Sequence, residues 1–241
     1  DLIRSRGLGD VYKRQLYSEW QSEIMIQQLR QAIGAGVDGI AMMGHPGDEA
    51  IMPLAEEANK AGILMMYQNV DVPSVRAKYG GGYVGANLAT QGYALGQEAI
   101  RLFGFKAGDT AIVMVPTGDY SRAQREDNTR IAFEEHGMKV VVLDGTPEMA
   151  TDPNSAIPVI SAALAANPDA KILVHTGGQM LGNAETFAVA AGYGPNELLQ
   201  IGFDTSPQVM SAFVNGYAHL TSDQQPFLQG YLPILSLCQM K

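Results

Sequence analysis

Cysteine is nearly absent from this sequence, and long apolar runs are missing altogether. Cys238 is the only cysteine among 241 residues. One thiol excludes an internal disulfide framework, and it is compatible with both a reducing and an oxidising compartment. No stretch approaches the roughly 18 consecutive apolar residues that a membrane-spanning helix needs. The remaining composition, 46% hydrophobic and 17% charged, is ordinary for a globular protein.

Basic residues are also scarce relative to acidic ones. The chain has 16 Lys and Arg against 25 Asp and Glu, which gives a formal net charge of −9. An acidic surface repels phosphate backbones, so nucleic acid is not expected as a partner.

Catalytic and metal-binding motifs are missing as well. No Walker lysine, C-x-x-C or G-x-S-x-G occurs, and no two histidines have the spacing of a metal site, so neither a metal nor an enzymatic activity is expected. Gly80, Gly82 and Gly85 satisfy G-x-G-x-x-G, but the preceding strand ends more than ten residues earlier. The acid expected about 20 residues later is replaced by Phe105. No dinucleotide, and no other cofactor, is predicted.

What the chain does have is a regular alternation of helical and strand periods. Ser18 is predicted to cap a first helix that ends at Gly36, Pro53 is placed in the first turn of the second helix, and residues 71–82 are predicted as a loop. A βαβ rhythm of this kind predicts α/β folding with parallel sheets that helices cover on both faces. The predicted strands are 37–43, 63–67, 83–84, 110–115, 138–143, 171–175, 198–203 and 217–221, and the later helices are 88–103, 122–136, 155–166, 179–191, 206–215 and 230–241.

The two ends of the chain depart from this rhythm. Residues 1–15 carry four basic and two acidic side chains in an otherwise acidic chain, and they are predicted to be a non-native leader without the apolar core of a secretory signal. Two long strands precede the 71–82 loop and five follow it. Two strands are too few for the part of the chain before the loop to form a stable sheet of its own. The fold is therefore expected to be truncated at both ends.

Polar side chains follow the predicted strands, at the sheet edge where open α/β proteins bind ligands. Carboxylate, carboxamide and guanidinium groups pair with the hydroxyls of a sugar, and aromatic rings stack on its apolar face. The polar candidates are His45, Asn69, Asp71, Arg122, Arg125, Asn128, Asp204 and Gln224, and the aromatic candidates are Tyr67, Tyr83, Tyr120 and Phe203.

Five short stretches give the chain a resemblance to a known family. They are A35-G-V-D-G-I40, A58-N-K-A-G-I63, Y83-V-G-A-N87, I201-G-F-D204 and the DQQP run that begins at Asp223. In this order and spacing, over about residues 16–241, the chain resembles the ribose- and xylose-type periplasmic binding proteins that serve sugar ABC importers. Residues 225–235 are similar to a subgroup of simple-sugar binders.

The resemblance implies a type I periplasmic binding protein, in which two Rossmann-like lobes joined by a hinge close on a sugar. The first lobe would comprise residues 16–85 and 225–241, and the second residues 86–224. T176-G-G-Q179 departs from the family by lacking an asparagine ligand, which leaves Gln179 as a substitute. Arg125 is favoured as the ligand arginine, with Arg122 and Arg130 left open. The implied ligand-binding residues are His45, Asn69, Arg125, Gln179, Asp204 and Gln224.

By the same resemblance, the protein would be a monomer in the periplasm, or lipid-anchored at the cell surface, that delivers a monosaccharide or related small polyol to an ABC permease. The alternative is the sugar-sensing effector domain of a lactose-repressor-type regulator. This sequence has no helix-turn-helix, and its acidic balance and QQP segment favour the transporter. The identity of the sugar stays open.

Overall fold

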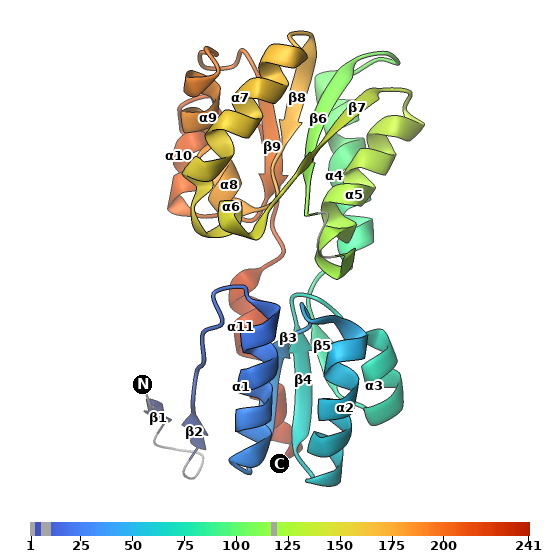
Figure 1. Cartoon of the computed structure of the whole chain (residues 1–241), viewed down its shortest axis with the longest axis vertical. Helices are drawn as coiled ribbons and strands as arrows, with labels where there is room; N and C mark the ends of the chain where they lie inside the picture. The colour runs from blue at the N-terminus through green and yellow to red at the C-terminus, as the bar shows by residue number, and fades with distance from the viewer. Residues whose placement is uncertain (1–2, 6–10, 117–119) are drawn as a thin grey trace.

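Strands and helices alternate along the chain, and the alternation builds two stacked α/β lobes (Figure 1). The computed structural model describes residues 3–5, 11–116 and 120–241. Each lobe is built on one sheet in which all strands run parallel. The predicted α/β class with two lobes of parallel sheet is confirmed.

The first lobe holds a three-stranded sheet in the order β3-β4-β5. Its strands are β3 (Gly39–Met43), β4 (Leu64–Gln68) and β5 (Gly82–Val84), and its helices are α1 (Ser22–Gly34), α2 (Gly47–Lys60), α3 (Pro73–Tyr79) and α11 (Pro226–Met240). Helices α2 and α11 both pack on β4. The last helix of the chain thus returns to the first sheet, behind it in Figure 1.

The second lobe holds a five-stranded sheet in the order β10-β9-β8-β6-β7. Its strands are β6 (Thr110–Val115), β7 (Lys139–Asp144), β8 (Ala170–Val174), β9 (Leu199–Phe203) and β10 (Leu220–Ser222). Its helical segments are α4 (Leu88–Phe103), α5 (Tyr120–Glu135), α6 (Pro147–Thr151), the 3-10 turn η1 (Pro153–Ala156), α7 (Ile157–Ala166), α8 (Gly178–Gly182), α9 (Ala184–Ala190) and α10 (Pro207–Val214).

Strand β6 shows why this sheet is apolar on both faces. All six of its residues are buried. Ala111, Val113 and Val115 belong to one core cluster, whereas Ile112 and Met114 belong to another. Successive side chains of a strand point to opposite faces, so helices on both faces require an uninterrupted apolar strand.

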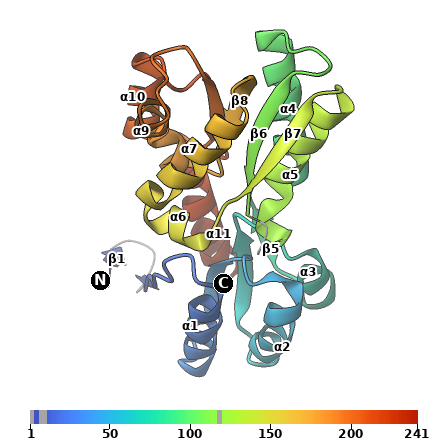
Figure 2. The same cartoon turned by 45° about the horizontal axis from the view of Figure 1, so that its top comes forward.

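The described chain crosses between the lobes at two places. One crossover follows β5 and leads into α4, and the other follows β10 and leads into α11. Both views show the start of α11 between the two lobes (Figures 1 and 2). The second crossover therefore lies at the junction, where any ligand between the lobes would meet it.

Several predicted boundaries are wrong, each for an identifiable reason. The cap of α1 is Gln21 rather than Ser18, because residues 18–21 form a turn in which the Gln21 N–H donates to the Ser18 carbonyl. Helix α2 begins at Gly47, which places Pro53 inside the helix rather than in its first turn. The predicted 71–82 loop contains α3, which Pro73 starts favourably and Val75 anchors in the core.

The smaller differences are of length. The last strand is Leu220–Ser222 instead of 217–221, and the last helix starts at Pro226 instead of 230. Strands β1 (Ile3–Ser5) and β2 (Val11–Lys13) pair only with each other among the described residues. Their assignment to a non-native leader stays a prediction.

Candidate ligand-binding site

The carboxyl ends of both sheets face the junction between the lobes. Strands β5 and β10 run directly into the two crossovers, and the other strands of each sheet are parallel to them. In the second sheet, the chain order reverses between β6 and β8. Open α/β sheets bind ligands beyond the carboxyl ends of their strands, at such a switch point. The topology therefore marks the junction as the place for a ligand.

Two residues at this junction have the same unusual backbone. Asn69 directly follows β4 and Asp204 directly follows β9, with φ of 65° and 69°. The left-handed region is unfavourable for most side chains and best tolerated by Asn and Asp. Each residue is thus placed at a strand end, one per lobe, with a polar side chain that its neighbours hold in place.

A continuous chain of hydrogen bonds joins these two residues across the hinge. The Nδ2 of Asn69 donates to the Oε1 of Gln224 over 3.4 Å, and the Nε2 of Gln224 donates to the Oδ1 of Asp204 over 2.7 Å. His45 Nε2 lies 3.0 Å from the Oδ1 of Asn69. Gln229 adds a second partner, because its Oε1 accepts from Asn69 over 3.0 Å. Residues from both lobes and from the crossover thus form one polar network.

Arg125 extends this network into the second lobe. Its side chain is buried, Nη1 lies 4.0 Å from Asp204 Oδ1, and Nη2 donates to the Thr176 carbonyl over 2.7 Å. The guanidinium lies 4.0 Å from the Phe203 ring centre, a cation–π contact. Burial, reinforced by the charge of Arg122, lowers the pKa of Arg125 to about 10. The group therefore remains a cation at neutral pH, with Glu126 as its buried counter-ion at 3.1 Å.

The structure also separates the three candidate arginines. Arg122 lies beside Arg125, since its Nη2 donates to the same Thr176 carbonyl over 2.5 Å and its Nη1 pairs with Glu126 over 2.9 Å. Arg130 pairs with Asp127 and Glu134 on its own helix. Arg125 is thus the arginine that faces Asp204, and Arg130 points elsewhere.

Gly177 lies directly beside these charged groups. A Cβ atom built at this position would lie 3.7 Å from Arg125 Nη2, 3.7 Å from Asp204 Oδ2 and 3.8 Å from Arg122 Nη2. Gln179, two residues on, is exposed on α8, and the described residues give its side chain no hydrogen bond. Of the six predicted residues, five share the network, and Gln179 lies outside it.

The remaining polar candidates have local roles. Asp71 pairs with Arg76 on the following helix over 2.7 Å. The Nδ2 of Asn128 donates to the Gln124 carbonyl. Among the described residues, no hydrogen bond links either side chain to the network.

The aromatic candidates differ in access. Tyr67 and Phe203 are completely buried, so the prediction that they stack on a ligand is wrong, because both rings are part of the core. The hydroxyl of Tyr83 lies 2.9 Å from the carbonyl oxygens of both Asn69 and Ala86, which share its single proton. This contact fixes the backbone at the junction. The Tyr120 side chain lies outside the described residues.

Two residues of the junction were missed from the sequence. Gln229 lies one turn inside α11, a helix predicted to start later. Trp20 precedes α1 and contacts His45 with ring centroids 5.6 Å apart. The sequence pattern predicts no strand before Trp20, so a rule based on the ends of predicted strands does not identify it. Its identity as the chain's single tryptophan was the available signal.

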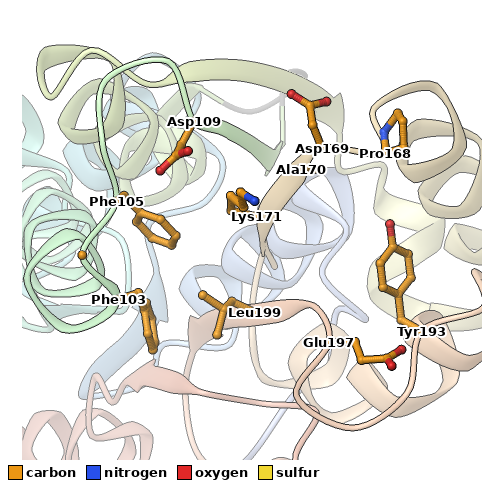
Figure 3. Close-up of a pocket in the computed structure, with 11 residues that line it drawn as sticks. Phe103, Phe105, Asp109, Pro168, Asp169, Ala170, Lys171, Tyr193, Glu197 and Leu199 are labelled. Carbon is orange, nitrogen blue, oxygen red and sulfur yellow. The ribbon is translucent and has the colours of Figure 1, made fainter.

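A pocket of about 400 Å³ lies at the opposite edge of the second sheet (Figure 3). It is lined by residues at the start of β6, β8 and β9, including Asp109, Asp169, Lys171 and Leu199. Asp169 already accepts a hydrogen bond from Thr110 over 2.8 Å. This pocket is at the amino ends of the strands, at the opposite end from the switch point, and it shares no residue with the network.

Two further features of the described part of the chain bear on other functions. No group of three or more metal-ligating side chains comes together there. Among those same residues, no helix has the length and apolar character to cross a membrane.

Comparisons with known proteins agree with this geometry. The chain is 28% identical over 225 residues to a protein of Sulfolobus acidocaldarius named Xylose/arabinose-binding protein XylF. The alignment covers 88% of this chain and 54% of that protein, so the chain spans about half the length of the curated relative it matches.

Solved structures show the same fold. An ABC sugar transporter periplasmic sugar-binding protein from Legionella pneumophila superposes with a TM-score of 0.80, at 23% identity over 91% of this chain and 79% of its own. An ABC transporter solute-binding protein from Agrobacterium vitis, solved with bound D-fucose, superposes with a TM-score of 0.81, at 18% identity over 94% and 77%. Both likenesses establish the type I periplasmic binding protein fold.

A family model supplies the assignment. The model described as periplasmic binding protein domain matches residues 5–241, nearly the whole chain. The resemblance inferred from the sequence is confirmed, and so is the expectation of a binding protein rather than an enzyme. The chain belongs to the periplasmic binding protein domain family.

Proposed function

We propose that the chain binds an uncharged sugar at the junction of its two lobes and delivers it to an ABC-type importer. The observation that carries this proposal is the hydrogen-bond network from His45 through Asn69, Gln224 and Asp204 to Arg125. It joins the carboxyl ends of both sheets, where ligands of open α/β folds bind. The relatives named above, a xylose/arabinose-binding protein and a D-fucose complex, support a monosaccharide as ligand.

The chemistry of these residues suits hydroxyl groups. A sugar hydroxyl both donates and accepts, so it needs a partner of each kind. Asp204 supplies a charged acceptor, Arg125 a planar donor, and the carboxamides of Asn69 and Gln224 one of each. A ligand would exchange the present bonds among these side chains for bonds to its own hydroxyls. Gln179, exposed at the start of α8, is proposed as an additional contact at the rim.

The cationic groups do not favour an anionic ligand. Glu126 pairs with both Arg122 and Arg125 over 2.9 and 3.1 Å, and Asp204 faces Arg125 from the other side. The two positive charges are thus matched by two negative ones. This balance supports a neutral sugar rather than a sugar phosphate or sugar acid.

The rest of the functional assignment follows from the family. We propose a first lobe of residues 16–85 and 225–241 and a second lobe of residues 86–224, with closure about the two crossovers. The protein would act as a monomer in the periplasm, or anchored at the cell surface, and dock in its closed form on a membrane permease. The relatives reported above are transport proteins, and no observation favours a transcription regulator.

Isothermal calorimetry with D-xylose, L-arabinose, D-fucose and D-glucose tests the proposal. Asp204→Asn keeps the shape and one acceptor but removes the charge, so the affinity for the bound sugar should fall about 10- to 100-fold. Asp169→Asn is the matched control, since it removes a carboxylate at the opposite edge of the same sheet, inside the pocket of Figure 3. It should leave the affinity unchanged.

Two results would contradict this assignment. If Asp169→Asn weakened binding and Asp204→Asn did not, the ligand would bind at the opposite edge of the sheet. If no sugar of the panel released or absorbed heat with the unmodified chain, sugar binding by this chain would be refuted.

A further inference from the structure

Trp20 lies at the end of the first lobe where the strands β3 and β4 have their carboxyl ends. It stands two residues before Ser22, the first residue of α1. In a βα lobe the helices run opposite to the parallel strands, so α1 begins at the edge where β3 and β4 end. Figure 1 shows the segment before α1 at the end of the first lobe that faces the second. The indole is therefore placed on the lobe surface that borders the junction.

The contact of Trp20 is with the network itself. Its ring packs against His45 with an interplanar angle of 67°, and His45 is only 7% exposed. His45 in turn is bonded to Asn69. Trp20 itself remains 49% exposed. One part of the indole covers a network residue, while another part stays open to whatever occupies the junction.

The backbone holds this aromatic side chain in a defined place. Glu19 and Trp20 have φ of 49° and 64°, two consecutive non-glycine residues in the left-handed region. Such residues are unfavourable, and they persist where the surrounding structure holds them. Here the Gln21 N–H closes a turn on the Ser18 carbonyl over 2.9 Å, and α1 follows at once. The indole is thus presented by a hydrogen-bonded turn directly before α1.

We infer that Trp20 forms the first-lobe wall of the ligand site and stacks on the apolar C–H face of a ring-closed sugar. This inference rests on the proposed function and adds a selectivity to it. A cyclic sugar offers a continuous C–H face to an aromatic ring, whereas an open-chain alditol with as many hydroxyls does not. Trp20 therefore favours cyclic sugars over the corresponding alditols, a discrimination that hydrogen bonds alone provide poorly.

The sequence makes a direct test possible, because Trp20 is the only tryptophan. Titration of the unmodified chain with D-xylose and with xylitol, followed by tryptophan emission and by calorimetry, should show a change of emission for the ring sugar. Trp20→Ala should lower the affinity for D-xylose about threefold to tenfold and leave that for xylitol within about twofold. Trp20→Phe should restore most of the loss. The same comparison with D-fucose and fucitol extends the test to a second ring sugar.

Tyr17→Ala is the matched control. Tyr17 is 75% exposed on the same segment. Gln28 donates a hydrogen bond to its backbone carbonyl, which the substitution keeps, so this variant should bind like the unmodified chain. Circular dichroism of each variant checks the fold. If the ring sugars bind and Trp20→Ala binds them as tightly as the unmodified chain does, the inference on Trp20 is wrong while the proposed function stands. If the unmodified chain binds no sugar, both are wrong.

Discussion

At the scale of single residues, the junction collects side chains in energetically unfavourable positions. Asn69 and Asp204 have left-handed backbones, and Arg125 is a cation with 1% exposure. Each would be a poor choice if stability were the sole demand, because strain and charge burial both lower it. Their convergence on one hydrogen-bond network indicates a local arrangement that binding, rather than folding, requires.

His175 gives a residue-scale prediction about acid stability. It follows β8, its Nε2 lies 2.9 Å from Gln200 Oε1, and its ring stacks on Phe187. Burial lowers its pKa from 6.5 to about 4. Between about pH 6.5 and 4, the unfolded chain therefore binds a proton at this histidine, whereas the folded chain does not. Stability should be full above about pH 6.5 and fall by roughly 3 kcal/mol as the pH drops to 4.

Urea unfolding followed by circular dichroism at pH 7, 5.5 and 4.5 measures this loss. His175→Gln removes the titrating group, so its unfolding free energy should fall less steeply over the same range. Burial also lowers the pKa of His219, so part of the slope should remain in the variant. An identical slope in both proteins would show that His175 does not control the acid response.

The candidate residues could be predicted to a large extent, because their position follows from topology. Asn69 and Asp204 directly follow strands, and His45 and Gln224 come two residues after strand ends. Parallel strands bring these carboxyl ends together. Arg125 required a choice among three arginines that only the helix orientation could make. Trp20 and Gln229 were not predictable by that rule, since both precede or enter helices, and their approach to the network depends on how those helices pack.

At the scale of elements, helices α4 and α5 cross at a glycine. A Cβ on Gly92 would lie 1.7 Å from the Arg125 carbonyl oxygen, and Thr129 Oγ1 donates to the Gly92 carbonyl over 2.9 Å. The two helices can approach this closely because Gly92 has no side chain. Since Arg125 is at the contact point on α5, this crossing also positions the guanidinium of the candidate site.

Gly92→Ala should therefore push the helices apart and destabilise the fold by about 1–3 kcal/mol. Gly230→Ala is a matched control, because Gly230 is also the fifth residue of its helix and has no atom near a built Cβ. That variant should be neutral or stabilise by up to about 1 kcal/mol, since alanine has the higher helix propensity. Thermal unfolding of both variants makes the comparison. Equal melting temperatures would mean that α4 and α5 can separate without loss.

Element types were more predictable than their limits. Continuous apolar runs identified the long strands of both sheets, because strands of a parallel sheet are buried on both faces and are therefore apolar at almost every position. Helix α3 was mistaken for a loop because Pro73 and Ser74 favour turns as well as helix starts. The decisive factor, burial of Val75 against α2 and the first sheet, is a tertiary contact that local sequence does not reveal.

At the scale of the whole molecule, one side chain spans the hinge. The Oε1 of Gln224 accepts from Asn69 of the first lobe, and its Nε2 donates to Asp204 of the second. The sequence pattern predicts two lobes. Their mutual orientation depends on few contacts such as these, and each contact is too weak to leave a pattern in the sequence. A neutral carboxamide is suited to this place because it donates on one side and accepts on the other.

Gln224→Ala should loosen this link and broaden the range of lobe orientations in the ligand-free protein. Double electron–electron resonance between two spin labels measures the effect. One label is attached to Cys238, which is exposed on α11, and the other to a cysteine that replaces the exposed Lys106 of the second lobe. Gln208→Ala, which removes an exposed glutamine of α10, should leave the distance distribution unchanged. A saturating sugar should narrow the distribution of the unmodified chain, because a ligand held by both lobes stabilises the closed form. It should narrow that of Gln224→Ala less, since the variant lacks one of the ligand contacts proposed at the hinge. Distributions of equal width with and without Gln224 would show that the crossovers alone set the lobe orientation and that this glutamine does not restrain the hinge.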